Sequence, residues 1–160
     1  TNLILLALEK SVDGAVRLLD FMYKPGYYAY GSGWDYPLNK ASLAKALKRL
    51  RESGFIDFIE EDEVVLKLTD KGRKRAVIAD LQNTEGAWDG KWRVVVFDIP
   101  ESKRLARDLL RRNLKVWGFT QWQKSVWVTK KNCTKSLRQY VANIGIEDWV
   151  MIIESGNVGL

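Results

Sequence analysis

A single carboxylate, Asp98, directly follows four consecutive apolar residues in the segment WDGKWRVVVFDIPE, residues 88–101. An apolar run of this length predicts a strand that is buried on both faces. An acid at the end of such a strand has two ordinary uses. It can cap the helix that follows, or it can bind a hard cation such as Mg²⁺.

The rest of the composition narrows the chemistry that Asp98 can support. The chain contains no histidine and one cysteine, Cys133. It therefore has no Ser-His or Cys-His dyad, no usual zinc site and no intrachain disulfide. An enzyme built from this sequence would have to work through carboxylates and a cation such as Mg²⁺. The single cysteine agrees with a reducing compartment, so we expect a cytoplasmic protein.

The two uses of Asp98 differ in what they require nearby. Pro100 and a basic segment follow Asp98 closely, which is typical of an acid at the start of a helix and favours the capping interpretation. One carboxylate per chain is a poor Mg²⁺ site, whereas two from a dimer, with waters and phosphate oxygens, would form a better one. A catalytic and metal-binding Asp98 therefore remains the alternative.

The charge of the chain favours a polyanionic partner. Its 160 residues have a formal net charge of +6. Residues 1–83 hold 13 Lys and Arg against 12 Asp and Glu, while residues 84–160 hold 13 against 8. Such an excess of positive charge favours nucleic acid. No apolar run approaches the roughly 20 residues that span a bilayer, so no membrane association is expected.

The first half, residues 1–83, has the predicted order of a winged helix-turn-helix. Its segment LAKALKRLRESGFIDF predicts a basic amphipathic helix followed by the first strand of a hairpin. The expected elements are a helix at 3–21, an aromatic ordered loop at 27–38, a helix at 40–53, strands at 55–59 and 64–68, and a helix at 73–81.

The helix at 40–53 is the candidate DNA-reading element. Leu43, Leu47 and Leu50 make its buried stripe, and basic residues occupy the opposite face. The candidate DNA-binding residues are Lys40, Ser42, Lys45, Lys48, Arg49 and Arg51. Four acids at 60–63 form the tip of the predicted hairpin and would be repelled by phosphate. This wing is therefore expected to stay off the DNA backbone or to face a protein partner.

The second half predicts a ferredoxin-like domain. A polar, glycine-containing linker at 84–90 precedes the pattern strand, helix, strand, strand, helix, strand in residues 91–160. This is a βαββαβ arrangement, so the whole chain is expected to be α+β. On its first helix, at 102–117, a basic stripe that would hold a nucleic-acid backbone consists of Arg104, Arg107, Arg111 and Lys115.

The segments WDGKWRVVVFDIPE, WGF at 117–119 and QKSVWV at 123–128 resemble the central domain of the PaaX-like transcriptional repressor family. That family joins an N-terminal winged helix to such a domain, and the domain is similar to the small CRISPR-associated nuclease-fold protein of the spacer-acquisition complex. The resemblance implies a DNA-binding repressor. In the CRISPR-associated relatives, the acid at the position of Asp98 is the proposed metal ligand, paired with its copy across a dimer.

These observations leave three interpretations. The first is a cytoplasmic homodimeric repressor that binds double-stranded DNA through its winged helices, requires no cofactor and responds to an unknown effector, if any. The second is a Mg²⁺-dependent nuclease or CRISPR adaptation subunit that uses Asp98 and the basic stripe at 104–115. The third is a protein-interaction module whose acidic wing binds a basic partner.

Overall fold

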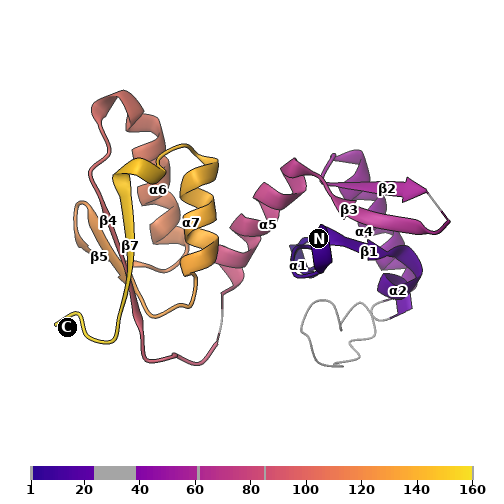
Figure 1. Cartoon of the computed structure of the whole chain (residues 1–160), viewed down its shortest axis with the longest axis horizontal. Coiled ribbons are helices and arrows are strands. Elements are labelled where there is room, and N and C mark those ends of the chain that lie inside the picture. The colour runs from indigo at the N-terminus through magenta and orange to yellow at the C-terminus, as the bar shows by residue number, and fades with distance from the viewer. Residues whose placement is uncertain (1, 24–38, 61, 85, 160) are drawn as a thin grey trace. The chain divides into compact units, whose positions relative to one another are not determined.

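The structure, a computed structural model, describes residues 2–23, 39–60, 62–84 and 86–159 (Figure 1). The chain divides into two compact units, Thr1–Ala79 and Asp80–Leu160. Two antiparallel sheets combine with helices, so the fold class is α+β, as predicted. The aromatic loop expected at 27–38 lies outside the described residues. Over the ranges that the structure does describe, no helix has both the length and the apolar character needed to span a membrane.

A three-stranded antiparallel sheet organises the first unit. Its strands are β1 (Ala15–Arg17), β2 (Ile56–Glu60) and β3 (Val64–Leu68), in the spatial order β1-β3-β2. The hairpin of β2 and β3 agrees with the two strands that the sequence predicts. The short strand β1 was not predicted, and it pairs with residues 65–67 of β3.

The prediction of one helix over residues 3–21 is wrong. The chain instead forms helix α1 (Asn2–Glu9), the 3-10 helix η1 (Val12–Gly14), β1, and helix α2 (Leu18–Tyr23). The backbone is left-handed at Asp13 (φ 56°) and at Gly14 (φ 66°). A right-handed helix cannot continue through such residues, so the chain turns and enters the sheet.

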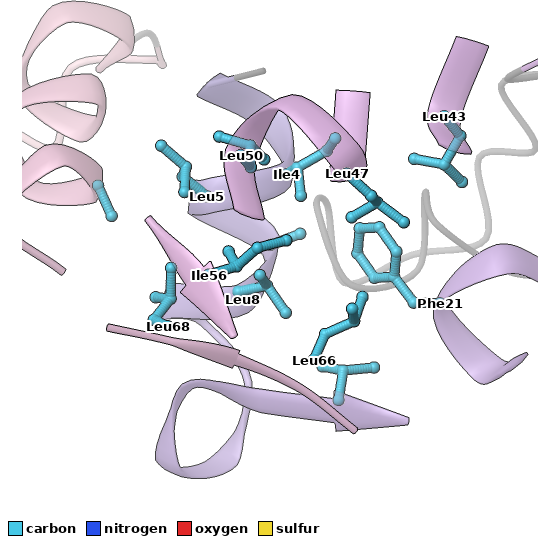
Figure 2. Close-up of a cluster of buried hydrophobic side chains, with 13 residues drawn as sticks. Ile4, Leu5, Leu8, Phe21, Leu43, Leu47, Leu50, Ile56, Leu66 and Leu68 are labelled. Atoms are coloured by element: carbon cyan, nitrogen blue, oxygen red, sulfur yellow. The ribbon is translucent and has the colours of Figure 1, made fainter. Parts of the chain in front are cut away.

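The core of the first unit lies between α1, helix α4 (Lys40–Glu52) and the sheet. Figure 2 shows the side chains of these three elements meeting around Leu8 and Ile56, both 0% exposed. The predicted apolar stripe of α4 is confirmed, because Leu43, Leu47 and Leu50 all belong to this cluster. The stripe fixes the rotation of α4 and thereby determines which of its residues face the solvent.

The end of α4 is fixed against the start of helix α5 (Asp70–Asn83). The Thr69 hydroxyl donates to the Gly54 carbonyl oxygen at 2.7 Å and accepts from the Gly72 amide at 3.0 Å. The Lys71 ammonium donates to the Ser53 carbonyl oxygen at 2.9 Å. A Cβ atom on Gly72 would lie only 1.9 Å from the Phe55 carbonyl oxygen. Only glycine allows the two backbones to approach this closely.

We therefore expect Gly72→Ala to lower the free energy of unfolding of the first unit by roughly 1–3 kcal/mol, because backbone must move to accept the methyl group. Urea denaturation followed by circular dichroism would measure the loss. Gly86→Ala is the matched control, since an added Cβ there meets nothing within 4 Å. Equal stability of the two variants would contradict the close approach at Gly72.

The second unit contains a four-stranded antiparallel sheet. Its strands are β4 (Trp92–Phe97), β5 (Thr120–Gln123), β6 (Val126–Thr129) and β7 (Val150–Ser155), in the spatial order β5-β6-β4-β7. The 3-10 helix η2 (Glu101–Lys103) and helix α6 (Arg104–Val116) follow β4. Helix α7 (Thr134–Asn143) and the 3-10 helix η3 (Glu147–Trp149) connect β6 to β7. This order agrees with the ferredoxin-like βαββαβ arrangement expected from the sequence.

The prediction that the strand before Asp98, which is β4, is buried on both faces is wrong. Burial alternates along β4, with Arg93, Val95 and Phe97 buried and the intervening residues partly exposed. Both helices pack on the buried face: Arg111 of α6 lies over Phe97, and Thr134 of α7 bonds to Glu154 of β7. The sheet register places Val94, Val96, Met151 and Ile153 together on the opposite, outer face.

A buried guanidinium connects β4 to β7 and to the segment before β4. The Arg93 side chain is 2% exposed, and its two terminal nitrogens each donate to an Asp89 carboxylate oxygen at 2.6 Å. The Arg93 Nε atom lies 3.6 Å from the Glu154 carboxylate, which in turn accepts from the Thr134 hydroxyl at 2.5 Å. A buried charge requires such compensation. The hydrogen bonds from Arg93 hold the pKa of Asp89 at about 2.

The single cysteine lies at the start of α7. Cys133 is 3% exposed and occupies the position before the first residue of the helix. Burial raises the pKa of its thiol to about 11, so the reactive thiolate is scarce at neutral pH. Cys133 therefore packs as a small apolar residue.

The stability of the second unit should depend on pH through Asp89. Its folded-state pKa of about 2 lies below the ordinary value of 3.8. Its contribution to the free energy of unfolding is therefore complete above pH 3.8 and is lost as the pH falls through about 2. We expect Asp89→Asn to be less stable at pH 7 and to lose less stability than the wild type between pH 4 and pH 2.

Urea denaturation across this pH range would measure the effect. Asp148→Asn is the control, because Asp148 is exposed and forms no ion pair within the described residues. If the free energy of unfolding of Asp89→Asn depends on pH as that of the wild type does, the ion pair with Arg93 contributes nothing to stability.

Candidate nucleic-acid interface

Helix α4 presents a fixed, solvent-exposed face. Asn39 caps its start, where the side-chain oxygen accepts from the Ala41 amide at 2.9 Å. Ser53 closes its last turn by donating to the Arg49 carbonyl oxygen, and Gly54 follows with φ 72°. Since both ends are capped and the apolar stripe faces the core, the orientation of the exposed side chains is set by the fold.

Lys45 and Arg49 lie at the centre of this exposed face, opposite the buried leucines. Neither side chain forms an ion pair or a hydrogen bond in the part of the chain that the structure describes. Lys48 lies beside them, with its nitrogen 3.9 Å from a Glu52 carboxylate oxygen. Both partners of this pair are mostly exposed, so water competes with it and Lys48 remains available.

The other predicted DNA-binding residues lie at the edges of this face. The Lys40 ammonium lies 4.9 Å from the centre of the Tyr23 ring, and the Arg51 guanidinium carbon lies 4.8 Å from that of Phe58. Ser42 is exposed near the start of the helix. The fold thus brings the six candidates onto one helix, with Lys45, Lys48 and Arg49 central and the others at the margins.

The acidic hairpin tip is partly neutralised by a residue that the sequence did not indicate. Arg17 of β1 lies 2.9 Å from a Glu63 carboxylate oxygen. Glu60 and Asp62 are exposed, and Glu61 lies outside the described residues. Arg17 was missed because β1 itself was not predicted.

Asp98 does not cap a helix, so the capping interpretation is wrong. The 3-10 helix η2 starts at Glu101 after an extended Pro100, and neither η2 nor α6 has a side-chain cap. The Asp98 amide donates to the Trp149 carbonyl oxygen at 3.0 Å, while its exposed carboxylate accepts no hydrogen bond within the described residues. Asp98 lies too early in the chain to reach the free amides of the helix.

The residues around Asp98 do not form a metal site within one chain. Across the residues that the structure describes, no group of three or more histidine, cysteine, aspartate or glutamate side chains is placed to hold an ion. The hairpin brings the Ser125 backbone next to β4, where its carbonyl oxygen accepts from the Phe97 amide at 3.1 Å. Serine and one carboxylate are too few ligands for Mg²⁺.

The basic stripe of α6 is largely paired with acids of its own helix region. Arg107 lies 2.9 Å from a Glu101 carboxylate oxygen, and Arg104 lies 3.6 Å from an Asp108 carboxylate oxygen. Arg111 also approaches Asp108, at 3.9 Å. Of the four predicted residues, Lys115 alone forms no such pair among the described residues. This stripe therefore offers less free positive charge than its sequence indicates.

Comparison with known proteins finds a family model that matches the second half of the chain. Residues 85–160 match the family model described as the PaaX protein central Cas2-like domain. A search of curated proteins finds no match to the chain. The matched region contains the whole βαββαβ unit from β4 to β7 and the segment WDGKWRVVVFDIPE. Residues 85–160 therefore correspond to a PaaX-like, Cas2-like central domain.

Proposed function

We propose that the chain is a transcriptional regulator of the repressor type that binds specific double-stranded DNA as a homodimer in the cytoplasm. The observation that carries this proposal is the exposed basic face of α4, where Lys45 and Arg49 project without acidic partners among the described residues. The PaaX-like central domain supports a regulator in general terms. No cofactor is required.

In this proposal the first unit acts as a winged helix. Helix α4 is the recognition helix, and a helix of this width fits the major groove of DNA. Lys45, Lys48 and Arg49 contact bases and phosphates, while Lys40, Ser42 and Arg51 contact the groove margins. The hairpin of β2 and β3 is the wing. Because Glu60 and Asp62 at its tip would be repelled by phosphate, the wing points away from the DNA backbone.

We expect Lys45→Ala and Arg49→Ala to weaken DNA binding. Removing a side chain that contacts a base should lower the affinity roughly fivefold to 100-fold. Removing one that contacts a phosphate should reduce the slope of log affinity against log salt concentration by about 0.9. Fluorescence anisotropy with duplex from the protein's own upstream region, at several salt concentrations, measures both quantities. Lys10→Ala is the control, because Lys10 is an exposed lysine in the turn after α1 and does not belong to α4.

Random duplex of the same length tests the specificity of this binding. A preference for the upstream fragment supports the repressor, whereas equal binding to both duplexes contradicts sequence-specific recognition. If both α4 variants keep the wild-type affinity and salt slope, this helix does not contact DNA and the proposed interface is wrong.

A metal-dependent nuclease or CRISPR adaptation subunit is the second candidate, and one observation favours it: the exposed Asp98 carboxylate has no partner within the described residues. Such an activity would need Mg²⁺ held between two copies of Asp98 in a dimer, with Lys115 on the nucleic-acid backbone. The same DNA incubated in Mg²⁺ and in EDTA separates the two functions. Shortening only in Mg²⁺, and abolished by Asp98→Asn, would replace the repressor proposal with the nuclease.

The homodimer is proposed to form through the outer face of the second sheet. Met151 is 61% exposed and Ile153 is 40% exposed, and the sheet register places them beside Val94 and Val96. A contiguous apolar face of this kind is typical of an interface. Two subunits would then present two α4 helices to paired half-sites.

We expect the double variant Met151→Lys, Ile153→Lys to be monomeric, because four ammonium groups, two from each subunit, would be buried in the interface without partners. Size-exclusion chromatography with light scattering measures the mass. Val116→Lys on α6 is the control, since Val116 is an equally exposed apolar residue, 66% exposed, away from this sheet face. A wild-type monomer, or a dimer that survives the double substitution, would contradict the proposed interface.

A further inference from the structure

A cleft of about 220 Å³ lies in the first unit, between α2, α4 and β2. Its walls include Leu18 and Met22 from α2, Ala44 from α4 and Phe58 from β2. Leu18, Met22 and Phe58 pack against the buried core but stay partly exposed. Because these side chains keep apolar atoms in contact with water, an apolar occupant of the cleft would be stabilised.

Two cations from α4 border this cleft. Arg51 lines it with its guanidinium over the Phe58 ring, and no carboxylate pairs with that guanidinium among the described residues. Lys48 also lines it, and its 3.9 Å pair with Glu52 is open to solvent. An arginine beside apolar walls offers a fork of N–H donors that matches a carboxylate. The cleft thus combines an apolar interior with positive charge at its edge.

We propose that this cleft binds a small amphipathic acid, with its apolar tail against Leu18, Met22 and Phe58 and its carboxylate at Arg51 and Lys48. The apolar walls select against compact polar anions such as inorganic phosphate, because such an anion would lose its hydration without apolar contacts in return. The two cations select against neutral apolar molecules of the same shape.

The ligand would regulate DNA binding, and this part of the inference rests on the proposed function. Lys48 and Arg51 both belong to the DNA-binding face of α4. A carboxylate held between them neutralises charge that otherwise attracts phosphate, so the bound ligand lowers DNA affinity. The coupling is reciprocal, since DNA held by the same cations lowers affinity for the acid.

Isothermal titration calorimetry of the full chain with hexanoate tests the cleft without DNA. Saturable binding is expected, with octanoate roughly fourfold tighter per added methylene until the cleft is full, and with 1-hexanol at least tenfold weaker. Ala44→Trp should abolish binding because the indole fills the cleft. Leu19→Trp is the control, since Leu19 is 67% exposed on α2 and does not line the cleft.

Arg51→Met provides a second variant that leaves the cleft open. It keeps an apolar side chain of similar length, removes the charge, and should weaken hexanoate binding while leaving 1-hexanol binding unchanged. Circular dichroism confirms folding of each variant. No saturable binding of hexanoate to the wild type, or equal binding to the wild type and Ala44→Trp, would overturn the proposed site.

The DNA arm uses anisotropy at constant ionic strength, with sodium chloride replacing sodium hexanoate in the control. Hexanoate should weaken DNA binding severalfold in the wild type and in Leu19→Trp, but not in Ala44→Trp. Ligand binding with unchanged DNA affinity would overturn the regulatory role. If the protein binds no DNA at all, the proposed function fails while the calorimetry still decides whether the cleft is a site.

Discussion

The buried guanidinium of Arg93 is the constraint on which the second unit depends. An arginine cannot lose its proton, so its burial in β4 is stable only where carboxylates and carbonyl oxygens surround it. Asp89 supplies a two-pronged ion pair from the segment before the strand, and Glu154 approaches from the neighbouring strand β7. Thr134 extends this network to α7. One charged side chain therefore joins β4 to the segment before it, to β7 and, through Glu154, to the start of α7.

The first unit solves a similar problem at the junction of α4, β2 and α5. A helix end leaves carbonyl oxygens without partners, and here the Thr69 hydroxyl and the Lys71 ammonium satisfy those of Gly54 and Ser53. The close approach of Gly72 to the Phe55 carbonyl oxygen leaves no room for a side chain at this junction. Since Leu43, Leu47 and Leu50 fix the rotation of α4 at the same time, its basic face is held by the packing and requires no acidic partner of its own.

The features that depend on local periodicity could be predicted from the sequence. The leucine stripe of α4, the hairpin of β2 and β3 and the βαββαβ order of the second unit all follow from spacings of two or of three to four residues. Strand β1 could not, because Asp13 and Gly14 interrupt a pattern that is otherwise helical. The sequence could not show that Asp98 fails to cap a helix. A cap depends on where the helix begins, and here the extended Pro100 places the first helical residue at Glu101.

Charges were harder to interpret than apolar residues. The basic stripe of α6 looked free in the sequence, although Asp108 lies four residues after Arg104 and three before Arg111, a spacing at which side chains on a helix meet. The ion pairs of Arg93 do not follow from the sequence either, because nothing in the residue pattern distinguishes a buried arginine from an exposed one on a strand. The cleft beside Arg51 required the tertiary structure, because its walls come from three separate segments.

Cys133 gives the second unit a built-in indicator of its own opening. It is the only thiol in the chain, and in the folded state it is both shielded from solvent and mostly protonated at neutral pH. An alkylating reagent therefore meets almost no reactive sulfur until α7 separates from the sheet. The rate at which the native protein takes up such a reagent counts the excursions of this unit to an open state, with no introduced label and no signal from the first unit.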